Sequence, residues 1–249
     1  MMALHHHEQG AGMALRDRKV LTFDVMGTLV DFESGVLNYI RPLAQKSGVD
    51  ASDDAILASL AREEARLHEQ RPQDPFPTML APMYRAVATE FGLPGDAKSA
   101  EGLRGSIPDW PAFADSVATL RQLKKRFRLV AMTNADNWAV GHFSKTLDHP
   151  FDDMVTAEDV GVCKPDPQVF AYTRGRQSTH GYKLADFLHV AQSQFHDIGI
   201  AKRLGFAVCW IERRMGKKGA GGTPATARTQ PDYHFGSLAE LAAAVEAGK

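Results

Sequence analysis

The stretch Lys19-Val-Leu-Thr-Phe-Asp24-Val-Met-Gly-Thr28 joins a short apolar run to an acid and a glycine turn. The run has the β-branched and aromatic composition of a buried strand, and it stops at Asp24. Gly27 suits a tight turn immediately after the acid. A carboxylate presented in such a turn can act as a nucleophile or as a ligand, or it can simply support the turn. We therefore predict that the first strand ends at a candidate functional site.

Further apolar runs of the same character occur later in the chain, and helical patterns over 113–127 and 196–204 lie between them. Strands that alternate with helices predict an α/β fold, a Rossmann-like parallel sheet with helices on both faces. Ligands bind such sheets at the carboxyl ends of the strands. The additional strands are expected over 128–134, 187–191 and 207–211.

Residues 34–107 have a different pattern, with helical periodicity over 35–46, 53–70 and 79–91 and no strand between them. Ser52 is a suitable N-cap for the second of these helices. We predict an inserted α-helical cap domain over 34–107 and a core domain over 16–33 and 108–249. Residues 1–15, with three consecutive histidines, are expected to be a disordered leader or tag remnant, and 215–229 a mobile surface loop.

Composition excludes several classes of function. The 249 residues include 29 Lys plus Arg and 30 Asp plus Glu, a net charge of −1, so no overall field favours nucleic acid or anionic membranes. No apolar run approaches the roughly 20 residues of a spanning helix. Cys163 and Cys209 are too few for a disulfide framework or a four-cysteine zinc site. We expect buried thiols, a cytoplasmic location and no nucleic-acid or membrane partner.

Three more motifs are placed where strands end or loops begin. Thr133-Asn134 follows the second strand, Lys164-Pro-Asp-Pro167 forms a stiff loop, and Gln192-Ser-Gln-Phe-His-Asp197 leads into a helix. Each is weak alone, because Thr-Asn is common turn chemistry, a lone lysine is usually solvated, and Asp197 suits the first turn of a helix.

Together, in this order, the four motifs resemble those of the haloacid dehalogenase (HAD) superfamily of hydrolases. The 188–197 run and Trp110-Pro-x-Phe113 resemble its L-2-haloacid dehalogenase branch. The resemblance extends over almost the whole chain from about Arg18. It implies a HAD-like core with a helical cap, and a hydrolase with an aspartate nucleophile.

Two departures bear on the type of reaction. Phosphatases of the superfamily carry a second acid two residues after the nucleophile, but this chain has Met26, which cannot transfer a proton. Their fourth motif offers paired acids for Mg²⁺, whereas here Gln192 and Ser193 leave only Asp197. We therefore expect no metal and no cofactor, with Mg²⁺ required only if a phosphatase alternative holds.

The resemblance implies displacement of halide from a small 2-haloalkanoic acid. Asp24 would form an ester with the substrate, and water would hydrolyse that ester with help from Lys164 and Asp197. An arginine of the cap, for which we choose Arg62 over Arg41 and Arg66, would hold the leaving halide. The other expected substrate-binding residues are Met26, Thr28, Thr133, Asn134, Ser193 and Gln194.

Several alternatives remain open at this point. Phe170 lacks the hydroxyl that the dehalogenase pattern has at its position, and Gln192 and Gln194 replace shorter side chains. His196 is a candidate acid or base, or it caps the helix; His189 is expected only to be buried. Other readings are a Mg²⁺-dependent phosphatase, a hydrolase that opens the ring of a cyclic amino acid, or a non-catalytic binding protein. The expected partner is a small anionic substrate, and a homodimer is left open.

Overall fold

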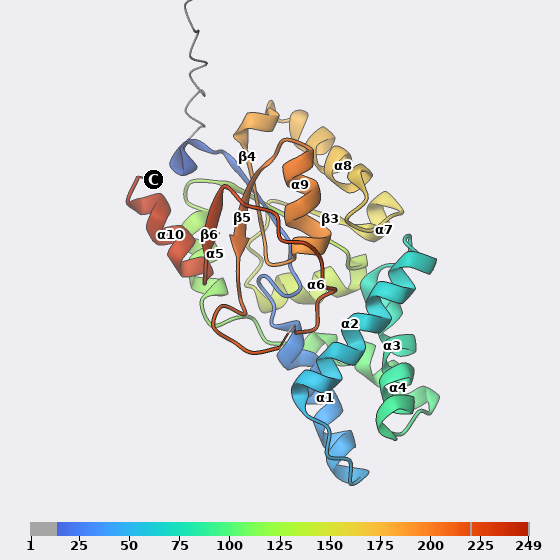
Figure 1. Cartoon of the computed structure of the whole chain (residues 1–249). Helices are drawn as coiled ribbons and strands as arrows, with labels where there is room; N and C mark the ends of the chain where they lie inside the picture. Colours follow the sequence, from blue (N-terminus) through green and yellow to red (C-terminus); the bar gives the residue numbers. More distant parts are fainter. Residues whose placement is uncertain (1–13, 220, 249) are drawn as a thin grey trace, which may run out of the picture.

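The computed structural model describes residues 14–219 and 221–248, and its centre is a six-stranded sheet in the order β3-β2-β1-β4-β5-β6 (Figure 1). Every pair of neighbouring strands is parallel. The α/β prediction is confirmed. The strands are β1 (Val20–Phe23), β2 (Arg128–Thr133), β3 (Asp153–Thr156), β4 (Phe187–Ala191), β5 (Ala207–Ile211) and β6 (Tyr233–Phe235).

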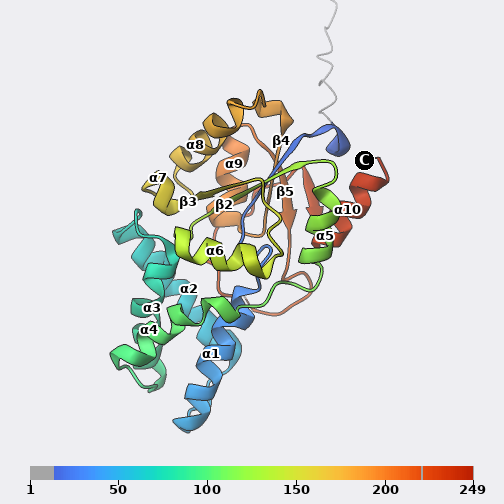
Figure 2. The ribbon, with the colours of Figure 1, turned by 180° about the vertical axis from the view of Figure 1, so that it is seen from behind.

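Alternate residues of β1, β2, β4 and β5 contribute to two separate apolar cores. Leu21 and Phe23 pack on one face of the sheet, whereas Val20 packs on the other. The first face is covered by helices α5, α6 and α10, which lie in front in Figure 2. The second face is covered by α8 and α9, which lie in front in Figure 1. The core helices are α5 (Ser116–Leu123), α6 (Asn137–Thr146), α7 (Ala157–Val160), α8 (Pro167–Ser178), α9 (Gly199–Arg203) and α10 (Leu238–Glu246).

The cap lies beyond the carboxyl ends of the strands, at the bottom of Figure 1. Ser52 accepts a hydrogen bond from the Ala55 N–H, as its sequence position predicts for an N-cap. The cap has one helix more than the periodicity predicted, and its first helix begins at Phe32. The cap helices are α1 (Phe32–Lys46), α2 (Asp53–Gln70), α3 (Phe76–Phe91) and α4 (Ala97–Gly105).

Short single-turn segments complete the described chain. The first, η1, includes Leu15, the last residue of the expected leader, and that side chain is buried in the core. The rest of that expectation, for residues 1–13, lies outside the described residues. Nowhere in 14–219 or 221–248 is a helix long and apolar enough to cross a membrane. These segments are η1 (Leu15–Asp17), η2 (Ile107–Asp109), η3 (Leu184–Asp186) and the π-helical turn η4 (Gln194–Ile198).

Part of the surface loop expected over 215–229 packs against the cap, and the remainder is exposed. We call residues 212–219 and 221–230 the covering segment, because they cross from the core onto the cap. Arg214 donates a 2.6 Å hydrogen bond to Glu33 of α1, and the Gly222 N–H donates to the same carboxylate at 2.9 Å. Gly222 itself is buried. The covering segment therefore connects the chain after β5 to helix α1.

A glycine contact fixes the first cap helix against the chain that returns to the core. A Cβ at Gly35 of α1 would lie 2.4 Å from Cγ of Trp110, a side chain that is 1% exposed. Trp110 stacks on Phe143 of α6 and donates a hydrogen bond to Ser106. The contact leaves no room for a methyl group.

We predict that Gly35→Ala lowers the free energy of unfolding by about 1–3 kcal/mol, because the added methyl overpacks a rigid contact. Gly141→Ala is the matched control: it lies in α6 with no atom within 4 Å of an added Cβ, so it should gain about 0.5–1 kcal/mol. Urea unfolding of both variants measures the difference. Equal effects in the two variants would contradict this packing.

Candidate active site

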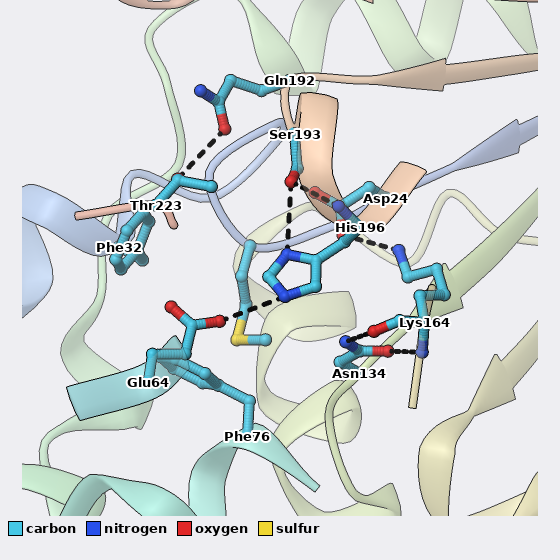
Figure 3. Close-up of a pocket in the computed structure, with 11 residues that line it drawn as sticks. Asp24, Phe32, Glu64, Phe76, Asn134, Lys164, Gln192, Ser193, His196 and Thr223 are labelled. Carbon is cyan, nitrogen blue, oxygen red and sulfur yellow. Dashed lines mark hydrogen bonds and ion pairs between the residues drawn. The ribbon is translucent and has the colours of Figure 1, made fainter. Parts of the chain in front are cut away.

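A cavity opens between the carboxyl ends of the central strands and the cap helices α2 and α3 (Figure 3). Its volume is about 40 Å³, counted as space open to the centres of water molecules. One water needs roughly 10–15 Å³ on that measure, so the cavity admits a ligand of a few heavy atoms. The lining residues are Asp24, Met26, Phe32, Glu64, Phe76, Asn134, Lys164, Gln192, Ser193, His196 and Thr223.

Asp24 is presented at the end of β1 by the turn that the sequence predicted. Gly27 has a φ of 81°, in the left-handed region that glycine adopts without steric cost. Thr28 donates a 2.7 Å hydrogen bond to Asp24 Oδ2, and it accepts one from the Gln192 N–H. Burial raises the pKa of Asp24 above its ordinary value, and the nearby Asp197 carboxylate adds to the rise. Thr28 therefore orients Asp24 and does not line the cavity.

Lys164 is buried and uses all three of its ammonium protons within the protein. Its Nζ donates to Asp24 Oδ1 at 3.0 Å, to Asp197 Oδ1 at 2.6 Å and to the Met132 carbonyl at 2.8 Å. An ammonium has only three N–H donors, so none is left for a ligand. The charge of Lys164 thus holds the two carboxylates together.

Asp197 is fully buried and is fixed from two sides. Besides Lys164, the His189 ring approaches it, with Nε2 2.9 Å from Oδ1. Lys164 and His189 outweigh the effect of burial and hold the pKa of Asp197 at about 2. Because this carboxylate is ionised, His189 Nε2 must donate to it, and Nδ1 lies 2.9 Å from the Thr22 hydroxyl. His189 is therefore more than a buried side chain: it positions Asp197.

Asn134 fixes the loop that carries Lys164. Its amide accepts a 2.6 Å hydrogen bond from the Lys164 N–H and donates one of 2.9 Å to the Lys164 carbonyl. The second amide N–H remains available at the cavity, which Asn134 lines. The neighbouring Thr133 does not line the cavity; its hydroxyl accepts from the Ala135 N–H at 3.2 Å. Asn134 can therefore act on both the loop and a ligand.

The cap contributes an acid to the cavity. Glu64 of α2 is buried, and its Oε1 lies 3.4 Å from Nε2 of His196, as Figure 3 shows. Burial and the negative charge of Asp24 raise the pKa of Glu64 to about 8. Burial lowers the pKa of His196 to about 3. At neutral pH both side chains are therefore mainly uncharged.

The three candidate arginines of the cap lie outside the cavity. Arg62 pairs with Glu90 at 2.8 Å, Arg41 with Asp53 at 2.5 Å and Arg66 with Glu63 at 2.8 Å. All three guanidinium groups are substantially exposed. The structure thus does not bring Arg62 together with Asp24.

Of the other predicted residues, Met26 and Ser193 line the cavity and Gln194 does not. Met26 forms an apolar part of the wall, and Ser193 lines the cavity while its Oγ accepts from the His196 N–H at 3.0 Å. Gln194 does not line the cavity: its side-chain oxygen accepts from the Thr229 N–H at 2.9 Å. Gln194 therefore anchors the covering segment.

The donor set does not fit a magnesium ion. Mg²⁺ requires several oxygen ligands in near-ideal octahedral geometry, commonly with carboxylates among them. Here the ammonium of Lys164 lies between Asp24 and Asp197, within 3.0 Å of both carboxylates. Met26 and Ser193 stand at the positions where a phosphatase of this kind carries further acids. In the described ranges, no group of three or more His, Cys, Asp or Glu side chains is placed to hold a metal ion.

Comparison with known proteins places the sequence in a family. A family model described as a haloacid dehalogenase-like hydrolase matches residues 18–204, about three quarters of the chain. The chain belongs to the haloacid dehalogenase-like hydrolase family. An (S)-2-haloacid dehalogenase of Pseudomonas fluorescens is 28% identical over 135 residues, which is 53% of this chain and 58% of the relative. The chain thus aligns with little more than half the length of that relative.

Solved structures of this hydrolase family share the fold. An L-2-haloacid dehalogenase from Xanthobacter autotrophicus, with chloropropionic acid covalently bound, has a TM-score of 0.75 at 18% identity, covering 92% of this chain and 98% of that one. A putative HAD-hydrolase of Bacillus subtilis bound to magnesium has a TM-score of 0.74 at 20% identity, covering 92% and 99%. At such identities the likeness establishes the architecture only.

Sequence reasoning missed Glu64 among the cavity residues of this HAD-like hydrolase, although a signal was present. Leu57, Leu60 and Leu67 are buried on one face of α2, and Glu64 continues their three-and-four spacing. Arg62 lies off that face. Phe32, Phe76 and Thr223 were also missed, and nothing in their local sequence distinguishes them from core or loop residues.

We predict that Lys164→Met lowers the free energy of unfolding at pH 7 by about 3–5 kcal/mol, because two buried carboxylates lose their shared cation. The loss should shrink at pH 5. Without Lys164 the folded-state pKa of Asp24 rises further, so acid protonates the carboxylate and removes the repulsion. Urea unfolding at both pH values tests this. Lys145→Met on the exposed face of α6 is the control, and equal stabilities of the two variants would contradict the account.

Proposed function

We propose that this chain is a hydrolase of the 2-haloacid dehalogenase type, which displaces halide from a small 2-haloalkanoic acid through an ester on Asp24. The observation that carries the proposal is the Asp24 carboxylate at the cavity, with Thr28 on one oxygen and Lys164 on the other. Met26 stands beside it where a proton donor would be needed for an alkoxide leaving group. A halide leaves as a stable anion and needs no such proton.

In the first step, an Asp24 oxygen attacks the carbon that bears the halogen. The carbon–halogen bond breaks and the halide departs with the electron pair. The free N–H of the Asn134 amide is a suitable donor to the departing anion. Phe32, Phe76 and Met26 surround the reacting carbon with apolar surface, which excludes water while the ester forms.

In the second step, water attacks the carbonyl carbon of the Asp24 ester. The products are the 2-hydroxy acid, a proton and the restored carboxylate. Esterification removes the charge on Asp24, so Lys164 is left with Asp197 as its one ionised partner. Asp197 Oδ2 is buried and has no hydrogen-bond partner within the described chain, and we assign it as the acceptor of the proton from the attacking water.

The relatives support this reaction. A curated relative is an (S)-2-haloacid dehalogenase, and a structure of the same fold holds chloropropionic acid covalently. Cys163 and Cys209 are free thiols, as expected for a reducing cytoplasmic location. That location and a homodimer stay predictions.

Ring opening of a small cyclic amino acid is the second candidate. It keeps Asp24 as the nucleophile, and Glu64 favours it in one respect, because an ionised Glu64 could pair with a ring ammonium. A Mg²⁺-dependent phosphatase is disfavoured by Met26, which cannot protonate a leaving alkoxide, and by a fourth motif with the single acid Asp197. A non-catalytic binding protein would require that no substrate turns over at all.

Purified protein should release halide from chloroacetate or 2-chloropropionate at neutral pH, and EDTA should not change the rate. Asp24→Asn should reduce the release by at least about 10³-fold, because it removes the nucleophile. Ion chromatography of the halide measures both. Undiminished release by Asp24→Asn, or no release from any haloacid by the unmodified enzyme, would refute the proposal.

A further inference from the structure

Among the residues that the structure describes, none presents an unpaired cation to an anionic substrate in the cavity. Lys164 donates its three N–H groups to Asp24, Asp197 and the Met132 carbonyl. The candidate arginines of the cap pair with surface acids instead. A 2-haloacid nevertheless brings a carboxylate into a buried space that already holds the charge of Asp24. An anion buried without a donor or a counter-ion is costly. The free N–H of Asn134 is one donor, but the departing halide takes it in the proposed reaction, so the substrate carboxylate needs a second donor.

Glu64 is placed to supply that donor. It lines the cavity from the cap, and one carboxyl oxygen is 3.4 Å from the otherwise unpartnered Nε2 of His196. In the described part of the chain, no side chain or backbone N–H donates a closer hydrogen bond to the Glu64 carboxyl than this contact. Figure 3 shows its second oxygen turned away from the His196 ring. If His196 Nε2–H faces the first oxygen, the second can carry a proton and donate it to a ligand.

Resting on the proposed function, we propose that Glu64 in its protonated form binds the substrate carboxylate by a hydrogen bond and thereby restricts haloacid turnover to the pH range in which Glu64 is neutral. A carboxylic acid and a carboxylate can share one proton where two carboxylates would repel each other. Glu64 thus takes the place of a cation at this end of the substrate.

The pH range follows from the groups that surround Glu64. Asp24 faces it across the cavity, His196 and Lys164 line the same space, Cys163 lies nearby, and His68 is on the same helix. The pKa of Glu64 is raised to about 8. The pKa values of His196 and His68 are lowered, so both rings are already neutral at pH 7. The pKa of Lys164 is raised, and the pKa of Cys163 is about 12. Burial raises the pKa of Asp24 as well. Glu64 ionises as the pH rises past about 8, and its neutral, donating form is lost on the alkaline side.

The test compares chloroacetate with the uncharged chloroacetamide between pH 6 and 10. For the unmodified enzyme, kcat/KM for chloroacetate should fall about tenfold per pH unit above the pKa of Glu64, whereas kcat/KM for chloroacetamide should not. Glu64→Gln keeps a donor but cannot ionise, so it should remove the alkaline decline. Glu63→Gln, one residue away and paired with Arg66 outside the cavity, should leave the profile unchanged.

A binding measurement separates this inference from the proposed reaction. Propionate has no leaving group, and its affinity for the unmodified enzyme, measured by calorimetry, should weaken about tenfold between pH 8.5 and 9.5. Glu64→Gln should abolish that change even if no haloacid is turned over. A decline that persists in Glu64→Gln, or that appears equally with chloroacetamide, would overturn the role of Glu64. Loss of halide release alone would count against the proposed function only.

Discussion

The site depends on one buried ammonium shared by two carboxylates. Lys164 lies 3.0 Å from Asp24 and 2.6 Å from Asp197, and all three side chains are almost completely buried. These groups come from three places in the sequence that the parallel sheet brings to one edge. Each of these three groups is held by a further residue. Thr28 orients Asp24, and His189 orients Asp197. Asn134 binds the backbone of Lys164. The shared cation opposes the effect of burial, which raises the pKa of the Asp24 carboxylate.

The same arrangement determines what the cap must do. Because Lys164 has no free N–H, recognition of an anionic substrate falls to groups around the cavity. The cap supplies a carboxyl group in Glu64, and its arginines lie at the surface. The covering segment, which follows the part of the chain that the family model matches, adds Thr223 to the wall. The carboxylates and the lysine of the site thus come from the sheet and its loops, whereas Glu64 and Thr223 reach the cavity from other segments of the chain.

Much of the core was predictable because its strands are uninterrupted buried runs, and β1, β2, β4 and β5 were located within two residues. Strands β3 and β6 were not, since β3 begins with the partly exposed Asp153 and Met154 and β6 has three residues. The inward face of α2 was misread because Arg62 was chosen by chemistry and not by helical spacing. The covering segment was taken as mobile for its glycines, yet a Cβ at Gly222 would lie 2.8 Å from Phe32. There glycine permits close packing.

The central claim is that Asp24 carries the substrate as an ester, and isotope transfer tests it most directly. Excess enzyme is mixed with chloroacetate in water enriched in oxygen-18. The enzyme is then digested, and the mass of the peptide that contains Asp24 is measured by mass spectrometry. Hydrolysis at the ester carbonyl leaves the solvent oxygen in the Asp24 carboxylate and sends an unlabelled oxygen into glycolate. We predict oxygen-18 in this peptide and none in the glycolate of the first turnover. Label in glycolate with an unlabelled Asp24 peptide would mean that water displaces the halide directly, and it would contradict the account.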